Sequence, residues 1–255
     1  MSWWGKVVGG AFWFMLGGPL GALMGAALGN YFDGGLEKPQ GFGATERVQS
    51  VFFTTTFAIM GYIAKIDGKV APDEIQIAEQ VMQQMRLSAL QRRVAINLFN
   101  EGKKDGFPVD EVLGQFRQEV SRRSNLIQMF LEIIIATAFA DGSLHSAEQQ
   151  LLEKIAHDLG YSQQQLKALL GRVTGQEQFL NENSFKDKLQ AAHELLGVNP
   201  GVADAELKKA YRRQMSQHHP DKLVAKGLPE EMMNIAAAKT REIKAAYELI
   251  AGQRK

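Results

Sequence analysis

The sequence predicts an all-α chain in three parts: an N-terminal apolar helix, a central helical domain and a C-terminal helical hairpin. Three observations carry this prediction. Residues 7–32 contain no charged side chain. From residue 46 to 172, apolar side chains recur at helical spacing without the alternation typical of strands. Residues 185–255 form three helical segments separated by residues that end helices.

Composition excludes several classes of protein. The 255 residues include no cysteine, so disulfides, thiolate zinc sites and a cysteine nucleophile are absent. The formal net charge is only +1, which gives no global electrostatic footprint for nucleic acid, and no nucleic-acid partner is expected. The sequence also contains no nucleophile–base set and no phosphate-binding loop. We therefore expect a protein that is not an enzyme and that needs no cofactor.

The uncharged segment 7–32 is long enough to cross a bilayer. As a helix it would span roughly 39 Å, against about 30 Å for the hydrocarbon core. Trp4 and Tyr31 flank it where interfacial aromatic residues are common. The alternative is a cleaved signal peptide with Lys6 as its charged end. The length of the apolar run favours a transmembrane helix.

Four glycines in this segment repeat at intervals of four residues. On a helix they would form one flat stripe, which a second backbone could approach closely. Such a stripe predicts self-association as a homodimer, while the alternative is that glycine is merely tolerated in a membrane helix. The four are Gly17, Gly21, Gly25 and Gly29.

The central segment contains an internal repeat. Residues 60–82 resemble residues 134–156, and in each an apolar helix is followed by an Asp-Gly turn and an amphipathic helix. This pattern resembles the tellurite-resistance TerB-like helical domain. The resemblance implies divalent-metal binding by acidic side chains near the turns, but Asp-Gly is also ordinary turn chemistry, so this metal site is only a weak prediction. The candidate ligands are Asp67, Asp73, Glu74, Asp141 and Glu148.

The C-terminal segment predicts three helices. The first runs from about Phe185 to Leu196 and stops at Gly197, and the second starts with Asp204 as its N-cap. Pro220 forces the second helix to end near His218, which is expected to be only a helix-end residue. The second helix carries two like-charged i,i+4 pairs for which no local compensation is expected, and this predicts a solvated face for an acidic partner. Its cations are Lys208, Lys209, Arg212 and Arg213.

These residues resemble the J domain of the DnaJ family. The resemblance rests on LLGV at 195–198, on LKKAYRRQMSQHHPDK at 207–222 and on REIKAAYELI at 241–250. The order of all parts resembles the membrane-anchored DnaJ-like proteins of Gram-negative bacteria (DjlA-type). The resemblance implies a co-chaperone that stimulates the ATPase of a DnaK-type chaperone. It assigns partner binding to His219, Pro220 and Asp221, with the four cations above holding an acidic patch.

A complete organisation follows from this interpretation. We expect a stress-related protein of the bacterial inner membrane, in contact with its lipid, with the N-terminus in the periplasm and the C-terminal domains in the cytoplasm. A competing hypothesis is a metal-responsive or envelope-stress scaffold built on the TerB-like domain. The expected parts are a periplasmic tip (1–6), a transmembrane helix (7–32), a linker (33–45), the TerB-like domain (46–172), a second linker (173–184) and the J domain (185–255).

Overall fold

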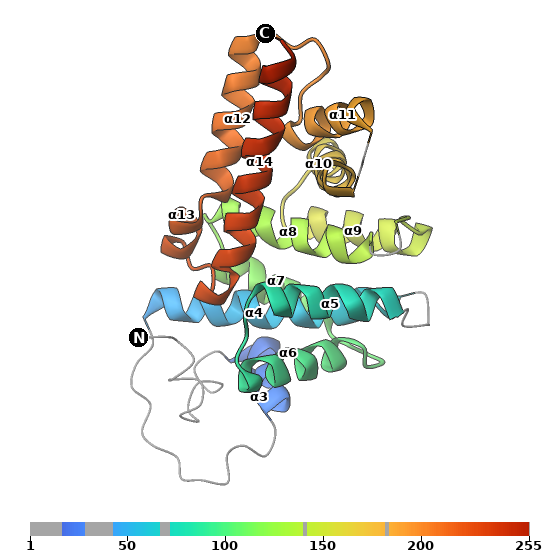
Figure 1. Cartoon of the computed structure of the whole chain (residues 1–255). Helices are drawn as coiled ribbons and strands as arrows, with labels where there is room; N and C mark the ends of the chain where they lie inside the picture. The colour runs from blue at the N-terminus through green and yellow to red at the C-terminus, as the bar shows by residue number, and fades with distance from the viewer. Residues whose placement is uncertain (1–16, 29–42, 67–71, 140–141, 182–183, 255) are drawn as a thin grey trace.

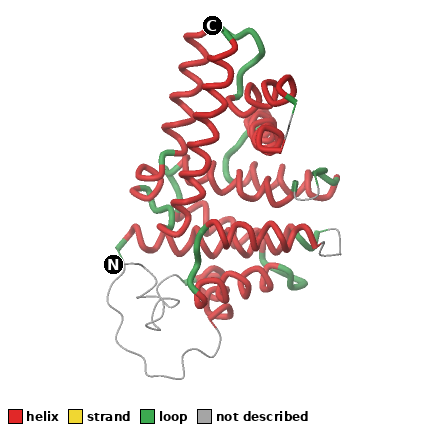
Figure 2. The backbone as a smooth tube through the Cα atoms, viewed as in Figure 1, coloured by secondary structure: helices red, strands yellow, loops and turns green. Residues whose placement is uncertain are grey.

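The computed structural model describes residues 17–28, 43–66, 72–139, 142–181 and 184–254. Within these ranges every regular element is helical, as predicted (Figure 2). The helices, labelled as in Figure 1, are α3 (Gly18–Leu28), α4 (Ala44–Ile63), α5 (Pro72–Gln84), α6 (Ala89–Gly102), α7 (Val109–Glu119), α8 (Ser124–Ala138), α9 (Ser146–Asp158), α10 (Gln163–Asn181), α11 (Phe185–Leu196), α12 (Asp204–His218), α13 (Pro220–Ala225), the 3₁₀ helix η2 (Glu230–Met232) and α14 (Met233–Gln253).

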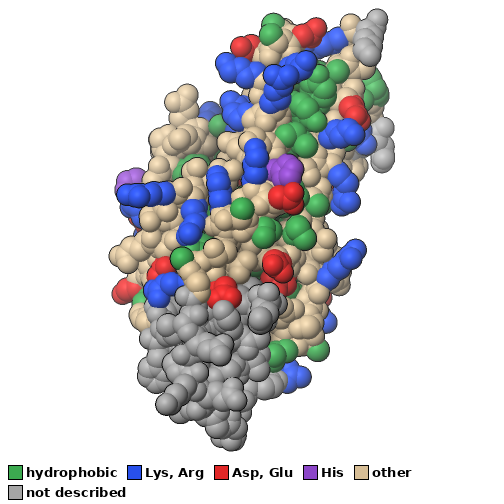
Figure 3. All heavy atoms as spheres, turned by 90° about the vertical axis from the view of Figure 1, so that its left-hand side faces the viewer, with side chains coloured by type: hydrophobic (Ala, Val, Ile, Leu, Met, Phe, Trp, Pro, Cys, Tyr) green, Lys and Arg blue, Asp and Glu red, His purple; other side chains and the backbone are tan. Residues whose placement is uncertain are grey.

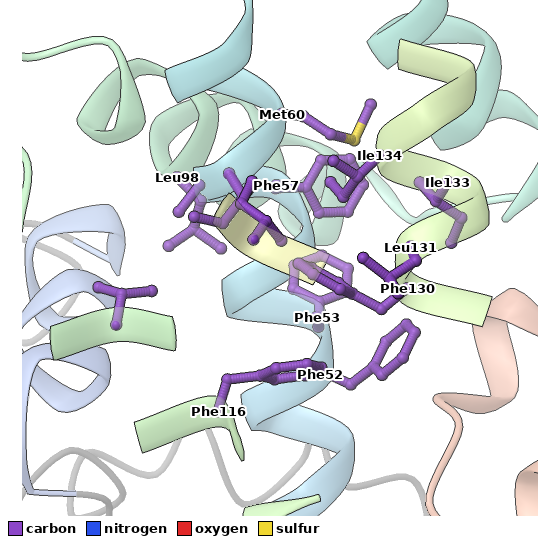
Figure 4. Packing of buried hydrophobic residues seen from close by; sticks show 14 of the residues in the cluster. Phe52, Phe53, Phe57, Met60, Leu98, Phe116, Phe130, Leu131, Ile133 and Ile134 are labelled. Carbon is purple, nitrogen blue, oxygen red and sulfur yellow. The ribbon is translucent and has the colours of Figure 1, made fainter. Parts of the chain in front are cut away.

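Helix α4 is the centre of the fold. Every residue from Val48 to Gly61 is buried, so the helix is surrounded on all sides and not only along one face. Phe52 lies 6.1 Å from Phe116 of α7, and Phe116 lies 4.6 Å from Phe130 of α8, measured between ring centroids. Figure 4 shows these rings meeting between the three helices. The aromatic cluster therefore fixes α4, α7 and α8 to one another.

Two glycines let α4 and α6 cross with their backbones in contact. A Cβ atom added to Gly61 would lie 1.9 Å from the carbonyl oxygen of Phe99. A Cβ atom added to Gly102 would lie 1.8 Å from the carbonyl oxygen of Ala58. Both obstacles are backbone atoms, which cannot rotate away as a side chain can. Only glycine is compatible with this crossing.

The internal repeat is confirmed as two helix pairs. Helices α4 and α5 form the first pair, and α8 and α9 form the second. Pro72 is the first residue of α5, and Ser146 is the first residue of α9 with His145 as its N-cap. Residues 67–71 and 140–141 lie outside the described part of the chain.

The C-terminal hairpin consists of α12 and α14, which run antiparallel with α11 packed beside them (Figure 1). Tyr211 and Tyr247 stack across it with ring centroids 4.4 Å apart, as expected for packing residues. Gly197 ends α11 in the left-handed conformation, with φ of 66°. The N-cap of α12 is Ala203, so the prediction of Asp204 as cap was wrong by one residue.

Helix α10 extends from the central domain to the packing of the C-terminal part. It continues to Asn181, through residues for which a linker was expected. The side chain of Phe179, in the last turns of α10, is buried in the same apolar cluster as Leu195 and Ile250 of the C-terminal part. The last turns of α10 thus belong to the packing of α11 and α14.

The described part of the expected membrane segment is α3, which packs on α6 and α7. Leu20 and Met24 are fully buried there. Gln115 of α7 bonds the backbone of both Gly17 and Leu20, and the Asn97 amide donates to the carbonyl oxygen of Ala27 at 2.7 Å. Residues 7–16 and 29–32 lie outside the described part. Among the described helices, none has both the length and the apolar character needed to cross a membrane.

The α4–α6 crossing gives a stability prediction. Changing Gly61 or Gly102 to Ala should lower the free energy of unfolding of the full chain by about 1–3 kcal/mol or more, because the methyl group overlaps a backbone carbonyl. Urea unfolding in detergent, followed by circular dichroism, measures this. Gly114 is the matched control: it is exposed within α7 with nothing near its added Cβ, so Gly114→Ala should be neutral or slightly stabilising. Equal effects at all three positions would contradict the crossing.

Candidate functional site

The His-Pro-Asp motif lies at the junction of α12 and α13. His219 is the residue between the two helices, with extended backbone angles of φ −61° and ψ 121°. Pro220 is the first residue of α13, where its missing N–H costs no hydrogen bond. His219 and Asp221 are exposed to solvent. Lys222 donates to the hydroxyl of Ser216 at 2.8 Å, which ties the two sides of the motif together.

The four cations of α12 form an exposed basic face that ends at this motif. Figure 3, seen from the side of Figure 1 on which α12 and α13 lie, shows Lys and Arg side chains spread over this face. All four predicted residues, Lys208, Lys209, Arg212 and Arg213, are exposed. One detail of the prediction was wrong: Lys209 does have a local partner, since its Nζ lies 3.6 Å from Glu206. A surface pair of this kind is weak and leaves the face basic.

The residue before the motif is buried, in a role that its sequence pattern does not predict. His218 is the last residue of α12, and its side chain is only 3% exposed. Its Nδ1 lies 2.9 Å from the carbonyl oxygen of Gln214, and its Nε2 lies 3.0 Å from both carboxylate oxygens of Glu132 on α8. His218 does end the helix, as expected. The expectation did not include this contact with the central domain.

Glu132 is the centre of a buried charge cluster. Lys239 of α14 places its Nζ 2.5 Å from one carboxylate oxygen, and Gln128 donates to the other at 2.9 Å. Burial alone would raise the pKa of Glu132. The positive charges of His218 and Lys239, together with their hydrogen bonds, hold this pKa well below its ordinary value. The carboxylate is therefore ionised although it is almost fully buried.

Apolar contacts continue the same interface. Leu223 of α13, Leu228 of the following loop and Met232 of η2 are fully buried in the apolar core of the central domain. The side chain of Gln49 on α4 also donates to the carbonyl oxygen of Leu228 at 3.3 Å. Asn125 at the start of α8 donates to the carbonyl oxygen of Gln217 at 3.2 Å. The hairpin end that carries the motif is thus seated on the central domain.

Comparison with known proteins assigns all three parts of the chain. The family model for the co-chaperone DjlA transmembrane domain matches residues 1–39, the tellurite resistance protein TerB model matches residues 54–170, and the DnaJ domain model matches residues 191–255. The co-chaperone protein DjlA of Photobacterium profundum is 44% identical over 97% of both chains. That of Escherichia coli K12 is 41% identical, over 100% of this chain and 99% of its own. That of Coxiella burnetii is 43% identical, over 98% and 97%.

The chain belongs to the DjlA co-chaperone family. The predicted order of membrane segment, TerB-like domain and J domain is that of the family, and the family is one of membrane-anchored proteins. No solved structure matches the chain. The domain limits expected from the sequence, such as 46–172 for the TerB-like domain, stay a prediction.

The candidate metal ligands are only partly within the described residues. Asp67 and Asp141 lie outside them, and Asp73 and Glu74 are placed on α5 without described side chains. Glu148 is buried and serves as a capping residue: its carboxylate accepts a hydrogen bond from the backbone N–H of His145 at 2.9 Å. Within the part of the chain that the structure describes, no three His, Asp or Glu side chains are grouped as a metal site would require.

The glycine stripe also lies only partly within the described residues. Gly21 and Gly25 are buried in α3, and Gly17 precedes this helix with φ of 59°. Gly29 lies outside the described residues. Self-association through the stripe therefore stays a prediction.

Glu242 on α14 is a second carboxylate of this interface, and its burial is offset less by nearby positive charge than that of Glu132. It borders a cleft of about 620 Å³ between the central domain and α14, and it accepts a hydrogen bond from Gln176 of α10 at 2.5 Å. Burial raises the pKa of Glu242, and the nearby positive charge of Lys239 offsets this only in part. Ionised Glu242 therefore costs stability in the folded protein.

This cost gives a pH-dependent prediction. Because the pKa is raised on folding, the contribution of Glu242 to stability is complete at low pH and is lost as the pH rises through its folded pKa. Glu242→Gln keeps an acceptor for Gln176 and removes the charge, so it should raise the thermal unfolding midpoint at pH 7. The gain should disappear at about pH 4, where the wild-type carboxyl is protonated. The control is Glu248→Gln, an exposed position on the same helix, where little change is expected. A lower midpoint for Glu242→Gln at pH 7 would contradict this account.

Proposed function

We propose that the chain anchors at the bacterial inner membrane and stimulates ATP hydrolysis by a DnaK-type chaperone through its His-Pro-Asp motif. The observation that carries the proposal is the exposure of His219 and Asp221 at the end of a basic helix face. Such a face attracts an acidic surface and increases the rate of encounter with it. In this interpretation the protein is a regulator, and the bond that is broken is in the ATP bound by its partner.

The motif and the basic face have separate roles in the proposal. His219, Pro220 and Asp221 engage the partner directly, with Asp221 available for an ion pair with a cation. Pro220 restricts the backbone and so reduces the conformational freedom lost on binding. Lys208, Lys209, Arg212 and Arg213 hold the acidic surface beside them. The motif therefore determines the stimulated rate, and the basic face determines the concentration at which stimulation occurs.

The test is single-turnover ATP hydrolysis by purified DnaK, with the full chain in nanodiscs. The wild type should accelerate hydrolysis, and His219→Gln should abolish the acceleration. Lys209→Glu/Arg212→Glu should keep it but raise the half-saturating concentration about tenfold or more, and this difference should shrink at high salt. Lys186→Glu on α11 controls for the change of charge, since Lys186 is exposed outside the basic face. Equal acceleration by the wild type and His219→Gln would refute the proposal.

We further propose that residues 1–6 lie in the periplasm and that the C-terminal domains lie in the cytoplasm, where ATP and DnaK are found. Membership of a membrane-anchored family and the 26 uncharged residues at 7–32 support the membrane crossing, and the orientation rests on the place of ATP and DnaK. If residues 7–32 cross the bilayer, α3 must leave α6 and α7, since it cannot occupy both places at once.

A topology reporter distinguishes the two orientations. Alkaline phosphatase, which is active only after export, should be inactive when fused after Lys255 of the full chain. The matched fusion of green fluorescent protein, which folds in the cytoplasm, should be fluorescent. High phosphatase activity would reverse the orientation and would remove DnaK as the partner.

A further inference from the structure

The His-Pro-Asp motif is held between two anchors in the central domain. On one side, His218 is fixed through both ring nitrogens, to Gln214 of its own helix and to Glu132 of α8. On the other side, Leu223 is fully buried in the apolar core of the central domain. Four residues, 219–222, lie between these anchors. The conformation of the motif therefore depends on contacts outside the hairpin.

One carboxylate connects both arms of the hairpin to the central domain. The carboxylate oxygens of Glu132 lie 3.0 Å from Nε2 of His218, at the end of α12, and one of them lies 2.5 Å from Nζ of Lys239, on α14. The side chains are 4% exposed for Glu132, 3% for His218 and 12% for Lys239. Water screens such an interaction weakly, so the attraction is much stronger than in a surface pair.

The seated motif remains accessible. His219 and Asp221 are exposed in this arrangement, and so are the four cations of α12. A contact that inhibited partner binding would be expected to bury some of these six side chains. The central domain covers instead the residues on either side of the motif, which are His218 and Leu223.

We infer that Glu132 is a positioning residue for the motif: through His218 and Lys239, the central domain holds His219, Pro220 and Asp221 in the conformation that binds the partner chaperone. This inference rests on the proposed function. It gives the TerB-like domain a direct part in the J-domain activity. Molecules in which His218 and Leu223 are not docked on the central domain then do not bind the partner. The apparent affinity of the whole chain is therefore proportional to the fraction of molecules that are docked.

Neutralising Glu132 tests the inference. Glu132→Gln removes the carboxylate that His218 and Lys239 share and leaves Lys239 only the weaker attraction of Glu242, so the state in which the hairpin end is docked on the central domain loses population. In the DnaK assay with the full chain in nanodiscs, the half-saturating concentration should rise about tenfold, while the maximal rate stays near that of the wild type. Partly unfolded protein would also raise the half-saturating concentration, in inverse proportion to the folded fraction, so each concentration is corrected for the folded fraction measured by circular dichroism.

Two further variants separate position from charge. Glu148→Gln is the matched control, because it neutralises another buried carboxylate of the central domain while leaving an acceptor for His145, and it should behave as the wild type. Glu132→Gln/Lys239→Met removes one charge of each sign, keeps an amide oxygen for His218 and should recover most of the lost affinity. If Glu132→Gln does not fold, Lys239→Met alone provides the test, with a smaller rise in half-saturating concentration expected.

Amide hydrogen exchange provides a readout that does not involve DnaK. In Glu132→Gln, the amides of His219 and of residues 221–228 should exchange faster than in the wild type, while those in the middle of α12 and α14 should be unchanged. Unchanged exchange at His219 and at 221–228, or an unchanged or lower half-saturating concentration, would overturn the inference. A wild-type chain that fails to stimulate DnaK would refute the proposed function instead, and hydrogen exchange would still test whether Glu132 positions the motif.

Discussion

The burial of α4 on all sides is the constraint on which the rest of the fold depends. A helix without a solvent-exposed face needs neighbours in every direction, and α4 contacts α6, α7, α8 and α3. Its first turns add a further neighbour, since Val48 lies against Gly227 and Gln49 bonds Leu228. One helix thus organises the central domain and also provides the surface on which the end of the C-terminal hairpin sits.

Features encoded by local chemistry could be predicted from the sequence. Gly197 ends α11 because a left-handed residue terminates a helix at little cost when it lacks a Cβ. Pro220 ends α12 because it disfavours the helical conformation for the residue before it, and His219 is extended. The exposed cations of α12 follow from the spacing of charges on one helix. In each case the decisive residues lie within a few positions of one another.

Features that depend on a second element could not be predicted in this way. His218 has the same local pattern whether its ring is solvated or bonded to Glu132, which is 86 residues away in the sequence. Gly61 and Gly102 carry no signal that they pack against each other's helices. The helical conformation of residues 173–181 was not predicted because these residues are mostly polar, whereas the helix is stabilised by packing on α11. An alignment of homologues would supply the missing signal, since paired positions vary together.

The interface between the domains also explains how a buried charge is tolerated beside a functional motif. An ionised carboxylate that is 4% exposed is unfavourable unless its partners satisfy it, and Glu132 has three: His218, Lys239 and Gln128. Replacing such a cluster with apolar side chains often leaves stability equal or greater, so stability alone does not account for it. Apolar contacts such as Leu223 permit sliding, whereas charged hydrogen bonds require defined distances and angles. The cluster therefore adds geometric definition to an interface that its apolar contacts already stabilise, at the residue directly before the motif.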